Sequence, residues 1–158
     1  MTKSTKILAI DPGNEKSAYV LWNADSEELW EMGIEENEKL VSMLSSLRVG
    51  SDVLAVEMIA SYGMPVGATV FETCLWIGRF IERWEDDYTL VYRKDVKLHL
   101  CHTSKAKDAN IRQALIDRYG EPGTKKEPGK LYGVKKDIWA ALAVAVYAGD
   151  KTIQRGKL

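Results

Sequence analysis

Residues 138–148 constrain the fold more than any other stretch of this sequence. They read Ile-Trp-Ala-Ala-Leu-Ala-Val-Ala-Val-Tyr-Ala, with no charged side chain among them. A helix without a polar face has to be covered on every side, because water would otherwise contact apolar surface all round it. We therefore predict a buried helix over 134–148, and the rest of the chain must supply the layers that enclose it.

The segments before this helix alternate between apolar runs and breaks that contain Gly or Pro, which predicts a defined order of elements. Strands are expected at 5–11, 17–23, 28–34, 52–58 and 88–92. Helices are expected at 36–48, 68–86, 95–100 and 106–119, and a loop over 121–132 is expected to be mobile. Three strands followed by alternating helices and strands predict an α/β fold with a mixed sheet.

The length and composition indicate one domain over residues 1–158. No apolar run reaches the roughly 20 residues that span a bilayer, so no membrane association is expected. The start, MTKSTK, leads directly into an expected strand and does not have the pattern of a signal peptide. Cys74 and Cys101 are too few for a disulfide framework, and a cytoplasmic location is expected.

Charge is distributed unevenly along the chain, although the net charge is only −1. Residues 1–92 hold 7 Lys and Arg against 16 Asp and Glu, whereas residues 93–137 hold 12 against 6. A basic segment of this kind is typical of a phosphate-binding surface. An ordinary solvated face that balances the acidic part of the chain explains it as well, so charge alone does not decide for nucleic acid.

Three acidic residues occupy positions where the surrounding pattern is apolar. Asp11 ends the first strand, Glu57 lies near the end of the strand at 52–58, and Asp137 precedes the apolar helix. A buried carboxylate without a partner is costly. If the two strands are neighbours, the three acids converge at one edge of the sheet. A divalent cation such as Mg²⁺ or Mn²⁺ would then offset their repulsion.

Each of these acids also has a simpler explanation. Asp11 stands in an Asp-Pro-Gly turn, where Asp is common. Glu57 can face solvent at the end of its strand. Asp137 suits the first turn of a helix, because the helix dipole favours an acid there. Spacing by itself does not prove convergence, so a metal site and three separate structural roles both remain open.

Four motifs, in order, give the chain a likeness to a known family. They are ILAIDPG (7–13), VLAVE (53–57), DVKLHLCHTSKAKDANIRQAL (95–115) and KKDIWAALAVAV (135–146). Together they resemble the RuvC-type Holliday-junction resolvases of the RNase H-like superfamily, particularly the small forms found in phages. The resemblance extends over nearly all of the chain. It implies an RNase H-like fold, with a mixed five-stranded sheet and helices on both faces in a single domain.

The resemblance also implies an activity. The family hydrolyses phosphodiester bonds in four-way and related branched DNA with the help of metal ions. On the matching motifs, Asp11, Glu57 and Asp137 would be catalytic and would bind two Mg²⁺ ions, for which Mn²⁺ can substitute. Lys107 would also be catalytic, because its charge would neutralise the charge that develops on the phosphate.

Further residues are implied to hold the branched DNA. Lys97 and Lys107 would contact the strand that is cut. Other cations would hold the backbone without reading bases: Lys105, Arg112, Lys135, Lys136 and, more broadly, Arg93, Lys94, Lys125, Lys126 and Lys130. Tyr62 and Met64, in the loop at 61–67, are candidates to insert between bases at the junction centre. An ordinary loop rich in Gly and Pro explains these two residues equally well.

A homodimer is expected from the substrate, since a four-way junction has approximate two-fold symmetry and requires two cuts. The helix at 68–86 carries an apolar stripe too wide for one narrow contact, and it is the candidate interface. The stripe includes Phe71, Leu75, Trp76 and Ile81. Packing inside the core of one chain is the alternative explanation for these residues.

One departure from the family pattern leaves the function open. RuvC proteins often carry two acids three residues apart in the last motif, whereas here Asp137 fills the first position and Ala140 the second. Asp108 is a spare acid in the basic segment, without an assigned role. This form is also similar to the YqgF-type relatives that process ribosomal RNA. An RNA-processing nuclease, and a non-catalytic structure-specific DNA-binding protein with a decayed site, are therefore the alternatives.

Overall fold

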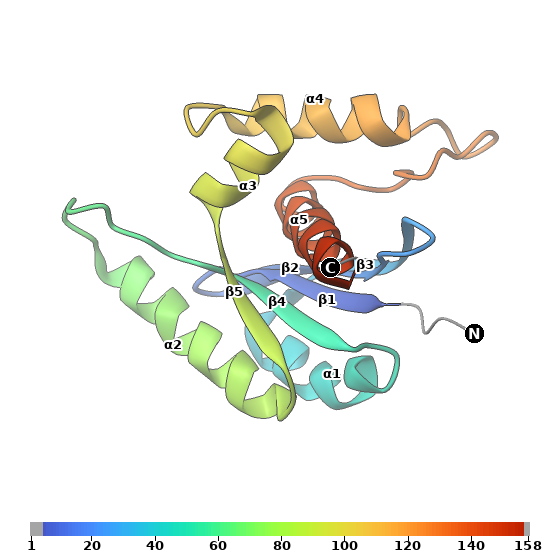
Figure 1. Cartoon of the computed structure of the whole chain (residues 1–158). Helices are drawn as coiled ribbons and strands as arrows, with labels where there is room; N and C mark the ends of the chain where they lie inside the picture. The colour runs from blue at the N-terminus through green and yellow to red at the C-terminus, as the bar shows by residue number, and fades with distance from the viewer. Residues whose placement is uncertain (1–4, 157–158) are drawn as a thin grey trace.

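The computed structural model describes the backbone of residues 5–156 and the side chains of residues 5–153. A five-stranded sheet lies at its centre, in the order β3-β2-β1-β4-β5 (Figure 1). The strands are β1 (Lys6–Asp11), β2 (Lys16–Asn23), β3 (Glu28–Glu36), β4 (Val53–Met58) and β5 (Tyr88–Tyr92). Residues 1–4, which begin the segment predicted not to be a signal peptide, lie outside the described residues, as do 157–158.

The strand directions make the sheet a mixed one. β1, β2 and β3 form an antiparallel meander, whereas β4 pairs in parallel with both β1 and β5. The predicted mixed five-stranded sheet is therefore confirmed. Because Ile10 of β1 lies opposite Val56 of β4, the residues that follow them, Asp11 and Glu57, reach the same edge of the sheet.

Helices cover both faces of this sheet (Figure 1). One face packs against α1 (Asn37–Val49) and α2 (Ala68–Trp84). The other packs against α5 (Ile138–Gly156), with α3 (Arg93–Cys101) and α4 (Asp108–Tyr119) beyond it. The predicted α/β class with helices on both faces is confirmed. Within residues 5–156, no helix is both long enough and apolar enough to cross a membrane.

Each face of the sheet has its own apolar core. Leu8 and Ile10 of β1 point to the core under α1 and α2, which includes Phe80. Ile7 and Ala9 point to the opposite core under α5. Successive side chains of a strand alternate between faces. Since both faces of β1 are covered, its sequence is continuously apolar until it reaches Asp11.

The C-terminal helix α5 is buried, as its sequence predicted. Ala141, Leu142 and Ala145 are completely inaccessible to solvent, and the helix lies against β1 and β2. Its bounds differ from the prediction of 134–148, because α5 begins at Ile138 and continues to Gly156.

The later start of α5 has a local cause. Lys136 adopts a φ of 49°, which interrupts a right-handed helical backbone. Asp137 is therefore the residue immediately before the first turn, and its carbonyl accepts hydrogen bonds from the amides of Ala140 and Ala141. This places the acid at the exposed end of a buried helix.

Other element bounds shift by only a few residues. α2 ends at Trp84 rather than at 86, because Glu85 takes a left-handed φ of 58°. α3 begins at Arg93 rather than at 95, and α4 begins at Asp108 rather than at 106. The predicted loop after α4 lacks helices and strands, and it closes through a hydrogen bond from the Gly129 amide to the Pro122 carbonyl.

Candidate active site at the sheet edge

Three acids meet where the parallel strands end. Asp11 is the last residue of β1, Glu57 lies on the neighbouring strand β4, and Asp137 precedes α5. We call these three residues the carboxylate cluster. Charge–charge interactions of both Glu57 and Asp137 act on Asp11, so the acids that the sequence singled out are near one another.

The protonation of Asp11 reports this crowding. Burial, hydrogen bonding with Glu57 and the negative charge of Glu57 raise the pKa of Asp11 from 3.8 to about 8, and Asp137 adds to the rise. The positive charge of Arg93 offsets only part of it. Strongly shifted acids gather at functional sites, because holding like charges together is unfavourable unless a ligand or the chemistry requires it.

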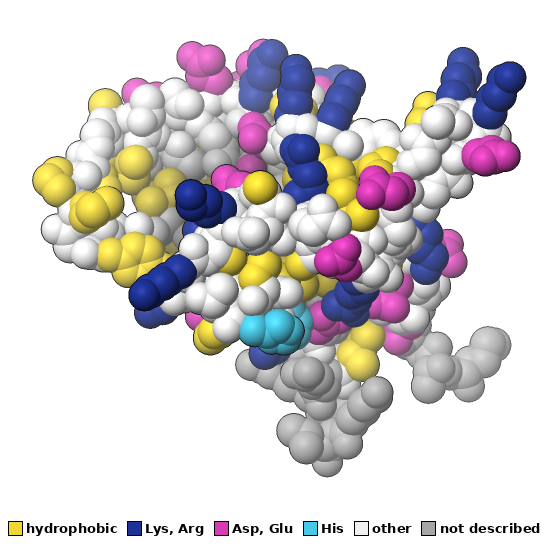
Figure 2. Space-filling model, turned by 90° about the horizontal axis from the view of Figure 1, so that it is seen from above, with side chains coloured by type: hydrophobic (Ala, Val, Ile, Leu, Met, Phe, Trp, Pro, Cys, Tyr) yellow, Lys and Arg dark blue, Asp and Glu magenta, His cyan; other side chains and the backbone are white. Residues whose placement is uncertain are grey.

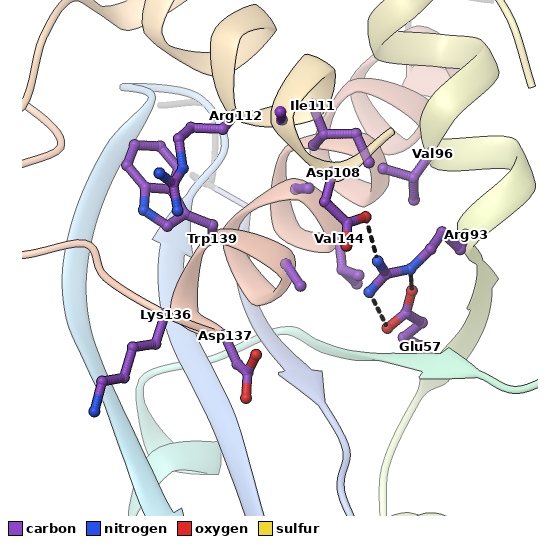
Figure 3. A pocket seen from close by; sticks show the side chains of 13 residues that line it. Glu57, Arg93, Val96, Asp108, Ile111, Arg112, Lys136, Asp137, Trp139 and Val144 are labelled. Atoms are coloured by element: carbon purple, nitrogen blue, oxygen red, sulfur yellow. Dashed lines mark hydrogen bonds and ion pairs between the residues drawn. The ribbon is translucent and has the colours of Figure 1, made fainter. Parts of the chain in front are cut away.

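Arg93 connects this cluster to the helices beyond it. Its Nε and Nη2 donate to the two carboxylate oxygens of Glu57 at 2.8 and 3.3 Å, and its Nη1 donates to Asp108 Oδ1 at 2.6 Å (Figure 3). Hydrogen bonding to Glu57 raises the pKa of the Arg93 guanidinium further above its usual value. One side chain thus ties β4, α3 and α4 together at the site.

Sequence reasoning did not assign this role to Arg93. It grouped Arg93 with cations that hold the DNA backbone, and it left Asp108 without a function. Arg93 is the first residue of α3, directly after β5, and β5 pairs with β4, which carries Glu57. Only that strand pairing brings the guanidinium to Glu57, so spacing along the chain offered no signal for it.

A polar clamp fixes the turn after Asp11. The Gly13 amide donates to Ser17 Oγ at 3.1 Å, the Ser17 hydroxyl donates to Asn37 Oδ1 at 2.6 Å, and Asn37 Nδ2 donates to the Gly13 carbonyl at 2.8 Å. A Cβ atom at position 13 would lie 2.3 Å from the Lys16 carbonyl oxygen, so only glycine fits. Ser17 and Asn37 are buried and were not predicted.

The donor atoms of the carboxylate cluster fit a hard divalent cation. Carboxylate oxygens are the ligands that Mg²⁺ prefers, and burial together with the nearby charges of Glu57 and Asp137 makes the ionised form of Asp11 unfavourable without a cation. Within residues 5–156, no three Asp, Glu, His or Cys side chains are close enough to hold a metal ion as they stand. Asp137 is exposed, so its carboxylate can move without unpacking the core.

A cavity opens beside the cluster, between α3, α4 and α5 (Figure 3). It is lined at one end by Glu57 and Asp137 and includes Arg112 and Lys136, two of the predicted DNA-binding cations. The structure therefore brings these two cations and two of the acids around one space.

The other predicted site residues lie outside this cavity. Lys107 is exposed and stands immediately before α4, with its amide donating to Asn110 Oδ1 at 2.8 Å. Lys97 is half-buried on α3, while Lys105 and Lys135 are exposed. Tyr62 and Met64 project from the loop after β4 and are 66% and 70% exposed.

The surface above the site is rich in cations. Viewed over α3 and α4, Lys and Arg side chains stand around an apolar recess, with acids between them (Figure 2). The basic segment therefore forms a mixed face next to the carboxylate cluster, which agrees with a contact surface for phosphate.

Comparison with solved structures identifies the fold. RuvC from Thermus thermophilus superimposes with a TM-score of 0.69 at 16% sequence identity, covering 95% of this chain and 97% of that one. The chain has a RuvC-type RNase H-like fold. The T. thermophilus RuvC in complex with a Holliday junction substrate gives a TM-score of 0.66 at 14% identity, with 95% and 96% covered.

At these identities the likeness establishes the fold alone. No protein-family model matches the sequence, and no curated protein matches it either. The predicted RNase H-like fold is confirmed, whereas the activity has to be argued from the site.

Proposed function

We propose that this protein is a metal-dependent endonuclease that resolves four-way and related branched DNA by hydrolysing phosphodiester bonds. The carboxylate cluster carries the proposal, since Asp11 and Glu57 lie near the ends of two parallel strands and the charge of Asp137 acts on Asp11. The RuvC-type fold and the cations beside the cavity support it.

The acids have distinct roles in this proposal. Asp11, on which the charges of both other acids act, would hold both metal ions, and Glu57 and Asp137 would hold one each. A pair of Mg²⁺ ions, or Mn²⁺ in their place, would supply an activated water and would stabilise the leaving oxygen. Asp11 is half-buried, and the clamp of Ser17 and Asn37 fixes the turn that follows it.

The cations of the chain would bind and orient the phosphate. Lys107 would neutralise charge on the scissile phosphate, and Lys97 would contact the same strand. Lys105, Arg112, Lys135 and Lys136 would hold the backbone. Contacts of this kind do not depend on the base sequence of the DNA, and the affinity they provide falls steeply as the salt concentration rises.

A homodimer would place two such sites on one junction. Trp76 and Ile81 of α2 pack into the core of their own chain, in line with the alternative considered for them. Phe71 and Leu75, one turn apart, are 62% and 71% exposed. Apolar side chains gather on the side where α2 lies (Figure 2), and we propose this surface as the dimer interface.

Strand β5 extends the proposed interface. Its exposed side chains point to the sheet face that α2 covers, because they lie opposite Leu54, Val56 and Met58 of β4; they are Tyr88, Leu90 and Tyr92. Changing both Phe71 and Leu75 to Glu would yield a monomer in sedimentation experiments. It would also replace paired symmetric nicks by single nicks.

The direct test is cleavage of a synthetic four-way junction with Mg²⁺, compared with a flap, a plain duplex and a structured RNA. We expect paired, symmetric nicks in the junction. Asp11→Asn should lower the rate by about 10³-fold, a loss comparable to that of a central electrostatic group in other active sites. Asp86→Asn, a change of an exposed acid away from the cluster, is the matched control.

The outcomes separate the alternatives. Cleavage of RNA alone would favour an RNA-processing nuclease, which the alanine at position 140 makes the main rival. Tight junction binding without any Mg²⁺-dependent cut would favour a non-catalytic DNA-binding protein. Either result overturns the proposed function.

A further inference from the structure

We propose that the cavity beside the carboxylate cluster receives a single unpaired nucleobase of the strand that is cut. This proposal rests on the proposed nuclease function and adds a binding site to it. The cavity has a volume of about 420 Å³. This falls within the range of about 300–1,000 Å³ that is typical of sites for small organic groups.

The lining of the cavity combines buried apolar side chains with charged ones. Val96 of α3, Ile111 of α4, and Ala143 and Val144 of α5 line it, and each is at most 6% exposed. Charged side chains line the cavity as well, including Arg93 and Asp108, which form an ion pair with each other. A nucleobase has apolar ring faces and polar edges, so it matches both kinds of side chain, and the chemistry of the lining favours a base.

Small residues on α5 create this space. Ala140 and Val144 are four residues apart and therefore lie on one side of α5, and Asp137 immediately precedes this helix. Ala140 stands between the acid and the apolar interior. A second acid at this position, as the family pattern often has it, would occupy part of the cavity. The missing acid thus leaves an opening from the carboxylate cluster into the apolar space.

The rim offers flat surfaces for stacking. The Arg112 guanidinium lies 5.1 Å from the centroid of the Trp139 ring, and both side chains line the cavity (Figure 3). Bases stack on aromatic rings and on guanidinium planes. Lys136 lines the same rim and is exposed, so it is placed to contact the phosphate of the nucleotide whose base enters.

The position of the cavity selects the kind of occupant. Glu57 and Asp137 belong both to its lining and to the carboxylate cluster, so an occupant would lie next to the phosphate that reacts there. A base within a duplex is held by its neighbours and cannot enter. A base at a branch point is already partly unstacked, so less free energy is needed to extrude it. The cavity would therefore favour branched DNA over plain duplex.

The test uses four-way junctions that carry one abasic nucleotide at successive positions around the cut phosphate. Binding is measured by fluorescence anisotropy in EDTA, so that no cleavage is needed. We expect one position at which loss of the base weakens binding by wild-type protein about 10-fold, as for loss of one stacked base. The neighbouring positions should have little effect.

Two variants connect that position to the cavity. Trp139→Ala removes a stacking surface, and Ala140→Leu fills the opening while preserving helix propensity. Both should bind intact and abasic junctions equally well. Trp30→Ala is the control, since Trp30 is a half-exposed tryptophan on β3, outside the cavity. It should retain the wild-type preference for the intact base, and circular dichroism would verify that all three variants fold.

A flat response along the abasic series overturns the proposal, and so does a base preference that persists in both cavity variants. If the wild-type protein cuts junctions with Mg²⁺ while the abasic series is flat, only the nucleobase site is wrong. If the wild type neither cuts nor binds junctions, the proposed function fails first, and the nucleobase site fails with it.

Discussion

The two faces of the sheet have comparable apolar cores but place similar ion pairs in very different surroundings. On the side of α1 and α2, Arg79 forms two hydrogen bonds with Glu38, and both side chains are exposed. On the side of α3 to α5, Arg93 forms two hydrogen bonds with Glu57, whose side chain is only 12% exposed. The two Arg–Glu pairs have similar hydrogen-bond geometry, but only the pair of Arg93 with Glu57 is largely shielded from solvent.

The difference in burial means that the ion pairs on the two faces have different energetic consequences. An exposed ion pair contributes little, because water and salt screen it. A buried carboxylate that loses its partner is left as an uncompensated charge. The face of α1 and α2 is thus a scaffold with an apolar outer surface, whereas the opposite face holds the charged residues of the proposed nuclease site. Four predictions test this division, beginning with the largest expected effect.

Phe80→Ala should lower the free energy of unfolding by about 3–5 kcal/mol, because Phe80 is completely buried under α2 and its removal leaves a cavity. Denaturant unfolding measures the loss. The affinity of the folded variant for Mn²⁺ should equal that of the wild type, since Phe80 belongs to the core on the other side of the sheet. A parallel loss of metal affinity would contradict the division between the faces.

Asp11→Asn should have the opposite effect on stability at high pH. The pKa of Asp11 is about 8 in the folded protein and 3.8 as a reference value. The folded state therefore holds a proton that the unfolded state loses between these pH values. Stability from this group is present at low pH and is lost as the pH rises through about 8.

Without metal, Asp11→Asn should therefore become more stable than the wild type on going from pH 5 to pH 9, by about 1–3 kcal/mol. Thermal unfolding in EDTA at several pH values measures this difference. Asp86→Asn controls for the loss of one negative charge. A constant difference between the Asp11 variant and the wild type would show that Asp11 has an ordinary pKa.

Arg93→Gln should change metal binding. In the proposed site a divalent cation would neutralise Glu57 as the Arg93 guanidinium does, so the two would compete for its oxygens. The variant should bind Mn²⁺ several-fold more tightly, about 3–10-fold for a loss of roughly 1 kcal/mol of competing interaction. Isothermal titration calorimetry measures the affinity. Arg79→Gln, which breaks the corresponding exposed pair, should leave it unchanged, and weaker binding by Arg93→Gln would rule out competition.

Lys136→Gln should give the smallest effect, on the salt dependence of DNA binding. If Lys136 contacts one phosphate, the slope of log K against log salt should become shallower by about 0.9. Lys39→Gln, on the opposite face and paired with Glu35, should leave the slope unchanged. Equal slopes for the wild type and both variants would place the DNA away from the cavity rim.

The sequence predicted the fold well because its signals are local or periodic. The continuous apolar run before Asp11 indicates a strand buried on both faces, and residues 138–148 require a buried helix. Errors occurred at ends, where backbone conformation decides. The helix expected from 134 begins at Ile138, because Lys136 takes a positive φ, and a lysine gives no indication of this in the sequence.

The candidate site was only partly predictable. Asp11, Glu57 and Asp137 stood out because each is an acid beside apolar residues. The parallel pairing of β1 and β4 brings Asp11 and Glu57 together, and the packing of α5 on β1 brings Asp137 near them. Arg93 and Asp108 did not stand out, because residues 93–137 contain many other charged residues of both signs. Their roles depend on a hydrogen bond across 36 residues to Glu57 and one across 15 residues between them.

The sequence by itself determined which segments are strands and helices, which helix must be buried, and which three acids are out of place. Only the tertiary structure determined which side chains surround those acids. It set the pKa of Asp11, since desolvation and neighbouring charge exist only when the strands are paired. It also opened the cavity at Ala140, because that space depends on how α3, α4 and α5 pack together.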